Sequence, residues 1–113
     1  MIRCIRKLFT LAVVLVLLAA FGYSVGLLPL QYRDIVEQYA AEYGLEEAFV
    51  YGVIFCESHF EPDVISSADA IGLMQVTEET GKWAAAQMGL DPAAIDLTDP
   101  DTNIHIGCWY LSW

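Results

Sequence analysis

Basic residues are scarce in this chain of 113 residues, which has five Lys and Arg against fifteen Asp and Glu. Three of the five, Arg3, Arg6 and Lys7, lie near the N-terminus, whereas every acidic residue lies at Asp34 or later. From Gln31 onward two basic and fifteen acidic residues remain, a net charge of −13. A surface of this sign repels phosphate backbones, so we expect no nucleic-acid partner.

Cysteine and histidine are also sparse, with three and two residues. Cys4 has only three residues before it, so it is not the lipidated cysteine of a lipoprotein signal. We expect Cys56 and Cys108 each to be a small buried apolar residue, with a disulfide between them as the alternative. His59 and His105 lack metal-ligand spacing, so the sequence predicts no metal and no other cofactor.

Charged residues are missing altogether from residues 8–30. A helix of about 20 apolar residues crosses the hydrocarbon core of a bilayer. Basic residues precede this run and acidic residues follow it, so the basic end is expected to stay inside the cell. We expect residues 1–30 to be an uncleaved transmembrane signal anchor, with the remainder outside the cytoplasmic membrane. A signal peptide cleaved near Ala20-Phe21-Gly22 and a buried helix of a soluble fold are the alternatives.

The remainder, residues 31–113, is small for a self-sufficient core and contains no repeat, low-complexity segment or long linker. It has room for one domain. Helix start and stop signals predict a mainly α fold class. We expect three helices at 32–43, 46–58 and 78–88, and a fourth that begins at Asp99.

Capping residues and apolar spacing support these helices. Gly44 suits the C-cap of the first, Thr77 the N-cap of the third, and Asp99 with Pro100 the start of the last. Apolar residues recurring at three and four predict the inner stripes. These are Ile35, Val36, Tyr39, Ala40 and Tyr43; Phe49, Val53, Cys56 and Phe60; Trp83, Ala84 and Met88; and Ile104, Gly107, Cys108 and Leu111.

Glu57 is the candidate acid of the chain. It lies near the end of the second predicted helix, beside the apolar stripe, and Pro62 forces the chain to leave the helix just beyond it. A carboxylic acid at the edge of an apolar face loses hydration as an anion, which favours its protonated form near neutral pH. From helical position alone, a solvated glutamate near a helix end is the alternative.

Four short motifs accompany this acid. They are Glu57-Ser58-x-Phe60-x-Pro62, Ser66-Ser67-Ala68, Gly72-Leu73-Met74-Gln75 and Asn103-Ile104-x-x-Gly107-x-x-Tyr110-Leu111. In this order and at this spacing they resemble the lytic transglycosylase module related to goose-type lysozyme. The resemblance covers residues 30–113 and implies a lysozyme-like fold, incomplete here, of which the chain holds the first two-thirds.

The resemblance also implies an activity. Bacterial enzymes of this family cleave the bond between N-acetylmuramic acid and N-acetylglucosamine in peptidoglycan and leave a 1,6-anhydromuramic acid end. Glu57 is then expected to carry both proton transfers. Ser66 is expected to orient the acetamido group of the substrate, and Met74 and Gln75 to contact the sugar. Tyr110 either positions the acid or only packs.

The sequence departs from the family pattern at three points. Asp69 replaces a usual glycine, and Asp tolerates a positive φ better than most residues. Glu78 replaces a usual proline, which we expect to alter helix entry and not chemistry. The chain also stops before the family's Ala-Tyr-Asn-Ala-Gly segment, so we expect a fragment of a longer enzyme. A muramidase-type hydrolase and a non-catalytic cell-wall-binding protein are the alternatives.

Overall fold

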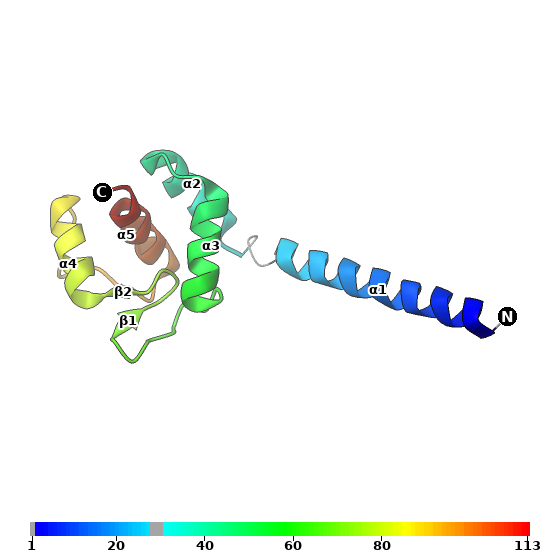
Figure 1. Cartoon of the computed structure of the whole chain (residues 1–113). Coiled ribbons are helices and arrows are strands. Elements are labelled where there is room, and N and C mark those ends of the chain that lie inside the picture. Colours follow the sequence, from blue (N-terminus) through cyan, green and yellow to red (C-terminus); the bar gives the residue numbers. More distant parts are fainter. Residues whose placement is uncertain (1, 28–30) are drawn as a thin grey trace. The chain divides into compact units, whose positions relative to one another are not determined.

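The computed structural model describes residues 2–27 and 31–113. The chain divides into two units, residues 1–31 and residues 32–113, and Figure 1 labels their helices and strands. Residue 1 and residues 28–30, which begin and end the predicted signal anchor, lie outside the described residues.

The first unit consists of helix α1, Ile2–Leu27. The side chains of residues 7–18 are all exposed, Phe9 and Leu17 among them. None of the helices formed by residues 2–27 and 31–113 combines the length and the apolar character expected of a membrane span.

Residues 32–113 fold into four helices and one short β-hairpin (Figure 1). Strands β1 (Ala70–Ile71) and β2 (Val76–Thr77) pair antiparallel. The mainly α class is therefore confirmed, and the helix ends agree with the predicted ends to within one residue. The helices are α2 (Arg33–Tyr43), α3 (Glu47–Ser58), α4 (Glu78–Gln87) and α5 (Pro100–Ser112).

Local capping signals determine these helix ends. Gly44 ends α2 in the left-handed conformation, with a φ of 66°. The Thr77 hydroxyl accepts a hydrogen bond from the Thr80 amide at 3.3 Å, where α4 begins. Asp99 Oδ2 accepts one from the Thr102 amide at 3.0 Å, where α5 begins. All three predicted caps are confirmed.

Helix α2 is held to the first half of α5 by aromatic and hydrogen-bond contacts. The Tyr39 ring stacks on the His105 ring with centroids 4.2 Å apart, and the Tyr39 hydroxyl donates to Asp101 Oδ2 at 3.0 Å. The Tyr43 hydroxyl lies 2.8 Å from His105 Nε2. Burial, assisted by the bond to Asp101, raises the pKa of Tyr39 to about 12. These contacts hold α5 against α2, and α5 also contributes residues to the candidate site.

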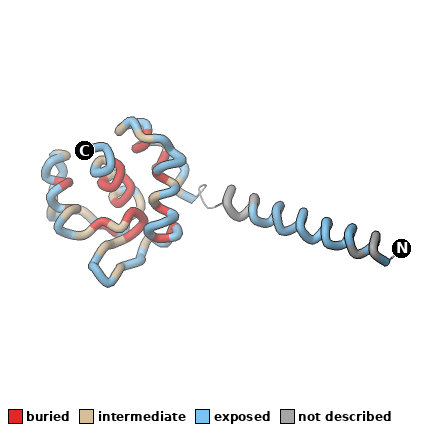
Figure 2. The backbone as a smooth tube through the Cα atoms, in the orientation of Figure 1, coloured by how far each residue is buried: buried red, intermediate tan, exposed pale blue. Residues whose placement is uncertain are grey.

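The core of residues 32–113 lies on the inner faces of α2, α3 and α5 and on the turn between the strands, as Figure 2 shows. Apolar side chains from all of these segments are removed from water, which is the main source of stability for so small a unit. The fully buried ones include Val36, Ala40, Val50, Ile54, Leu73, Ile104 and Ile106.

Helix α3 buries a different face from the predicted one. Val50, Ile54 and Ser58 are buried, whereas Phe49 is 52% exposed and Cys56 is exposed as well. Because residues 48–56 are apolar or small on every side, their spacing does not distinguish one face from another. The predicted stripe is therefore wrong for Phe49 and Cys56, whereas Val53 is half-buried and Phe60, just beyond the helix, is buried as predicted.

The second cysteine follows its prediction. Cys108 is buried, and burial raises the pKa of its thiol to about 12. Both Cys56 and Cys108 are free thiols, so the structure has no disulfide between them.

Two residues of the predicted inner stripes lie at the surface instead. Trp83 and Leu111 are each 38% exposed. The Trp83 ring meets Trp109 edge-on at a centroid distance of 5.5 Å and Trp113 at 5.0 Å. Large aromatic side chains on α4 and α5 therefore pack on one another at the surface rather than in the core.

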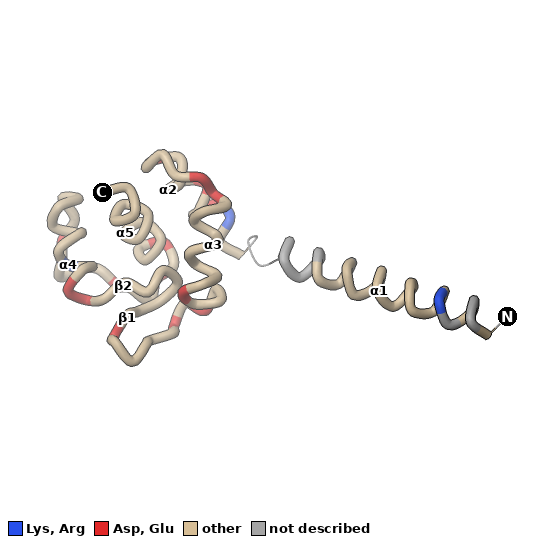
Figure 3. Tube along the Cα trace, viewed as in Figure 1, with Lys and Arg blue, Asp and Glu red and all other residues tan. Residues whose placement is uncertain are grey.

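Figure 3 shows Asp and Glu at several separate places in the second unit, among them α2, the end of α3 and the start of α4. Its two basic residues each pair within one helix turn, Arg33 with Glu37 at 2.6 Å and Lys82 with Glu78 at 2.5 Å. Exposed pairs of this kind contribute little stability. No other carboxylate of residues 32–113 forms an ion pair with Lys or Arg among the described residues.

Candidate active site

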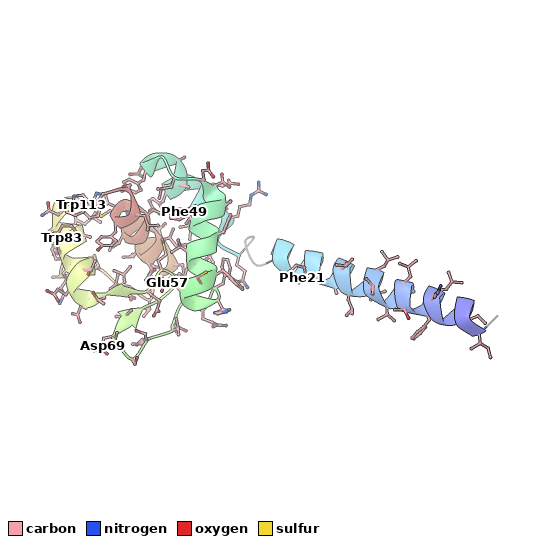
Figure 4. The ribbon with its side chains drawn as sticks, viewed as in Figure 1. Phe21, Phe49, Glu57, Asp69, Trp83 and Trp113 are labelled. Atoms are coloured by element: carbon pink, nitrogen blue, oxygen red, sulfur yellow. The ribbon has the colours of Figure 1, made fainter. Side chains whose placement is uncertain are left out.

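Four of the five predicted site residues line one pocket of about 340 Å³. Glu57 comes from α3, Met74 and Gln75 from the turn between β1 and β2, and Tyr110 from α5. Glu57 is labelled on α3 in Figure 4. The rest of the lining, which the sequence did not predict, consists of Val53, Val76, Thr77, Thr80, Gly107 and Leu111.

Glu57 occupies the last turn of α3. The helix ends after Ser58, because His59 and Phe60 both adopt the left-handed conformation, with φ of 51° and 64°. The chain thus leaves the helix before Pro62. Glu57 is exposed, and its carboxylate has no hydrogen bond or ion pair with the described residues. The expected loss of hydration at this acid is therefore not found in the free protein, and its carboxylate is free to meet a ligand.

Ser58, beside Glu57, ties α3 to the opposite side of the pocket. Its hydroxyl is buried and lies within donating distance of the Leu73 carbonyl, at 2.8 Å, and of the Ile54 carbonyl, at 3.0 Å. The bond to Leu73 spans fifteen residues of sequence. The acid and the loop that faces it are therefore held at a set separation.

The turn from Gly72 to Gln75 has a constrained backbone. Gly72 has a φ of 74° and Gln75 a φ of 52°, which is uncommon for a residue with a side chain. The Gln75 Nε2 group donates to the Gly72 carbonyl at 3.0 Å and to the Val64 carbonyl at 3.2 Å. Both bonds use the amide nitrogen, so the Oε1 atom remains available as an acceptor.

Asn103 on α5 joins this turn to the rest of the fold. It is fully buried, and its Oδ1 accepts from the Met74 amide at 2.8 Å. Its Nδ2 donates to the Ile71 carbonyl at 2.9 Å and to the Leu97 carbonyl at 2.7 Å. Asn103 belongs to the fourth motif, but the sequence predicted no role for it. A polar amide among the apolar residues of the inner stripe of α5 was the one feature that could have indicated a buried hydrogen-bonding role.

Gly107, one turn after Asn103, makes room for Met74. A Cβ atom at Gly107 would lie 2.9 Å from Met74 Cβ and nearer still to its sulfur atom. Since heavy atoms of this kind do not approach so closely, only glycine lets the Met74 side chain lie against α5. The spacing of Asn103, Gly107 and Tyr110 in the fourth motif thus matches three successive contacts of α5 with the site.

Ser66 is the one predicted site residue that does not line the pocket. Its Oγ atom accepts from the Ala68 amide at 3.2 Å and from the Ala70 amide at 3.1 Å, and so closes the turn before β1. Asp69 in this turn has a φ of 59°, as predicted for a residue in place of glycine. The hydroxyl proton of Ser66 is not used in these two bonds.

Glu57 is the only charged residue among the described residues that line this pocket. The other acids considered from the sequence, Glu61, Asp63 and Asp69, do not line it. Among residues 2–27 and 31–113 no cluster of three or more His, Cys, Asp and Glu could hold a metal ion. The pocket is therefore lined by one carboxyl group, one side-chain amide, one phenol and two threonines, with Val53, Met74 and Leu111 as apolar walls.

Residues 34–113 match the family model described as the transglycosylase SLT domain. Membrane-bound lytic murein transglycosylase C of Yersinia pestis (strain Pestoides F) is 40% identical over 85 residues, which cover 73% of this chain and 24% of that protein. The chain thus spans about a quarter of the length of the curated relatives it matches.

Two solved structures resemble the chain. The lytic transglycosylase Slt of Pseudomonas aeruginosa, an inactive mutant, has a TM-score of 0.70 and 31% identity over 75% of this chain and 14% of that one. The 70-kDa soluble lytic transglycosylase of Escherichia coli has a TM-score of 0.66 and 30% identity over the same shares.

Proposed function

The chain belongs to the transglycosylase SLT domain family, and from this membership we propose that residues 31–113 form a lysozyme-like domain that acts on peptidoglycan. The proposed reaction cleaves the β-1,4 bond between N-acetylmuramic acid and N-acetylglucosamine and leaves a 1,6-anhydromuramic acid end. The observation that carries this proposal is the single charged group, Glu57, in a pocket shared with Met74, Gln75 and Tyr110.

Glu57 would perform two proton transfers in turn. As the acid it protonates the glycosidic oxygen while the bond from that oxygen to C1 of muramic acid breaks. The acetamido group of the sugar stabilises the positive charge on C1. The 6-hydroxyl oxygen of the same sugar then bonds to C1 and returns its proton to the Glu57 carboxylate. The acid is regenerated and no water is consumed.

The single acid in the pocket favours this route over ordinary glycoside hydrolysis. Hydrolases with two catalytic carboxylates hold them on either side of the bond that breaks. Here no second carboxylate of the described residues lines the pocket, so the substrate's own acetamido and 6-hydroxyl groups take the second role. Because Glu57 is exposed in the free protein, the bound glycan itself must exclude water from the carboxyl group.

The other predicted contacts receive separate roles. The Met74 side chain, backed by Gly107, would pack on the sugar ring. Gln75 would accept a hydrogen bond from a sugar hydroxyl or amide through Oε1, because its nitrogen is already used within the turn. Tyr110, 50% exposed, would donate its phenolic proton. Ser66 would reach only a part of the glycan that extends beyond the pocket, through its own hydroxyl proton.

We further propose that α1 attaches the protein to the membrane, with residues 31–113 on the outer side. The apolar side chains of residues 8–18 in α1 are exposed, and its uncharged run follows Lys7. The Yersinia relative is named as membrane-bound. Extraction of membranes with sodium carbonate tests this proposal. Retention of the chain supports an anchor, whereas release into the supernatant contradicts it.

Mass spectrometry of the products tests the activity. Purified peptidoglycan is incubated with the full chain in mild detergent, with Glu57→Gln, and with Glu61→Gln as a matched control whose carboxylate lies outside the pocket. We expect anhydro-muropeptides from the parent and from Glu61→Gln, and none above background from Glu57→Gln. Reducing-end products would indicate a hydrolase. Products from neither parent nor variants, with glycan binding retained, would indicate a cell-wall-binding protein.

A further inference from the structure

We propose that Asn103 is the positioning residue of this site: it sets where Met74 and Gln75 stand opposite Glu57. It touches no substrate and acts through the turn that it holds. The reaction it would serve is the proposed transglycosylation, so this inference rests on the proposed function. The position of Met74, however, can be measured without catalysis.

The amide of Asn103 is almost fully used. Its oxygen accepts from the Met74 amide at 2.8 Å, and its nitrogen donates to the carbonyls of Ile71 at 2.9 Å and Leu97 at 2.7 Å. One donor faces the oxygen and two acceptors face the nitrogen, so the orientation of the amide is unambiguous. Asn103 and Ser58 are the two buried polar side chains within the described residues, and both hold this turn.

Two of the bonds of Asn103 hold the turn between the strands, one just before the turn at Ile71 and one within it at Met74. Ile71 is the last residue of β1, and Met74 precedes Gln75, which has the uncommon φ of 52°. A conformation of this kind persists only where surrounding contacts impose it. The side chain of Gln75 bonds only to Gly72 and Val64, within the hairpin region itself. Asn103 is therefore the side chain that places the turn relative to α5.

The backbone of the turn lies in close contact with this amide. A Cβ atom at Gly72 would lie 2.5 Å from both Asn103 Nδ2 and the Leu97 carbonyl oxygen. On the next turn of α5, Gly107 receives the Met74 side chain. A displaced Asn103 side chain would thus shift the backbone at Met74 and the wall that its side chain forms.

Asn103→Asp tests this role, because its two protonation states differ by one proton at this position. The neutral acid has the shape of the amide, accepts from the Met74 amide and donates one hydrogen bond. The ionised acid places negative charge against the Ile71 and Leu97 carbonyl oxygens and donates none. Burial and these carbonyl groups raise the pKa of the introduced carboxyl group above its ordinary value, so acidification from neutral pH should protonate it and recover most of the parent geometry, with one donated bond fewer.

The readout is the methyl resonance of Met74 in the full chain, labelled at methionine methyl groups, in mild detergent. Met88 on the far end of α4 is the internal control. In Asn103→Asp at neutral pH we expect the Met74 signal to move from its parent position and the Met88 signal to stay. As the pH falls, the Met74 signal should return. A Met74 signal that coincides with that of the parent at every pH would overturn the proposal.

Steady-state kinetics of Asn103→Asp then test whether the position of Met74 affects the proposed reaction. At neutral pH we expect kcat of Asn103→Asp to fall about 10- to 100-fold with a smaller change in KM, and the ratio of variant to parent to recover on acidification. A pH-independent ratio would overturn the positioning role while leaving the proposed function intact. A parent without activity would instead refute the proposed function, and the Met74 resonance would still decide the geometric inference.

Should Asn103→Asp fail to fold at neutral pH, hydrogen exchange in the parent protein decides. The Met74 amide should exchange at least about 100-fold more slowly than that of Asp63, an exposed loop residue, because its acceptor is buried. Equal exchange at the two amides would overturn the proposal, since Asn103 would not be holding the turn.

Discussion

Gly107 and Gly52 show how differently the same residue type acts at two helical positions. At Gly107 an added Cβ atom would meet the Met74 side chain, whereas at Gly52 it would meet nothing within 4 Å. Both glycines lie inside helices, where alanine is favoured intrinsically. Contact with a neighbouring segment therefore decides which glycine is required.

Gly107→Ala should destabilise the protein by about 1 kcal/mol, because displacement of Met74 outweighs the gain in helix propensity. Gly52→Ala, the matched control, should stabilise it by about 0.5 kcal/mol. Urea unfolding followed by circular dichroism measures both. Equal shifts of the two midpoints would show that the Met74 contact carries no constraint.

Ser58 is the second residue whose role depends on a distant segment. Ser58→Ala should lower the free energy of unfolding by about 1 to 2 kcal/mol, because the buried Leu73 carbonyl loses its partner. Ser112→Ala is the control, since Ser112 is exposed and bonds only within its own helix, to Trp109 at 2.7 Å. A change of less than about 0.5 kcal/mol is expected there.

At the scale of single elements, the helices differ in how they begin. Asp99 caps α5 through its side chain, whereas Glu46 stands at the N-cap of α3 with no side-chain cap bond. Glu46 has φ of −76° and ψ of 132°, the backbone conformation that a capping residue adopts. The helix that carries Glu57 therefore lacks a stabilising feature that α5 has.

Exchanging these features should change stability in opposite directions. Asp99→Ala should destabilise the protein by about 1 kcal/mol, because the Thr102 amide loses its acceptor. Glu46→Ser should stabilise it by about 0.5 to 1 kcal/mol by supplying an oxygen to the first turn of α3. Thermal unfolding of the two variants beside the parent gives the comparison. A lower melting temperature for Glu46→Ser would contradict the assignment of Glu46 as N-cap.

For the molecule as a whole, buried groups that resist ionisation make stability sensitive to alkaline pH. Burial raises the pKa of Tyr39 from 10.0 and that of Cys108 from 9.0, each to about 12. Above the ordinary values the unfolded chain releases these protons while the folded chain keeps them. The free energy of unfolding therefore falls as pH rises.

We predict that this loss begins near pH 9, as Cys108 titrates in the unfolded chain, and steepens above pH 10, as Tyr39 follows. Each group contributes up to about 1.4 kcal/mol per pH unit within its window. Urea midpoints measured between about pH 8 and about pH 11 test this. Cys108→Ala should flatten the decline, and Cys56→Ala, at an exposed position, should not. A flat profile in the parent would refute the prediction.

The sequence by itself determined those features that depend on near neighbours in the chain. Helix ends at Gly44, Thr77 and Asp99 follow from capping groups within a few residues, and all three were predicted correctly. The ordered motifs likewise pointed to Glu57, Met74, Gln75 and Tyr110, which the structure brings to one pocket. Capping groups within a few residues carry the first kind of information, and the family resemblance of the motifs carries the second.

Only the tertiary structure decided which face of α3 is buried, whether Ser66 lines the pocket, and which segments Asn103 joins to α5. Residues 48–56 are apolar or small all round, so contact with α2 and the turn at Leu73 selected the buried face. Ser66 closes its own turn instead of entering the pocket. Asn103 binds Ile71 and Met74 across about thirty residues, and no local pattern encodes partners so far apart in sequence.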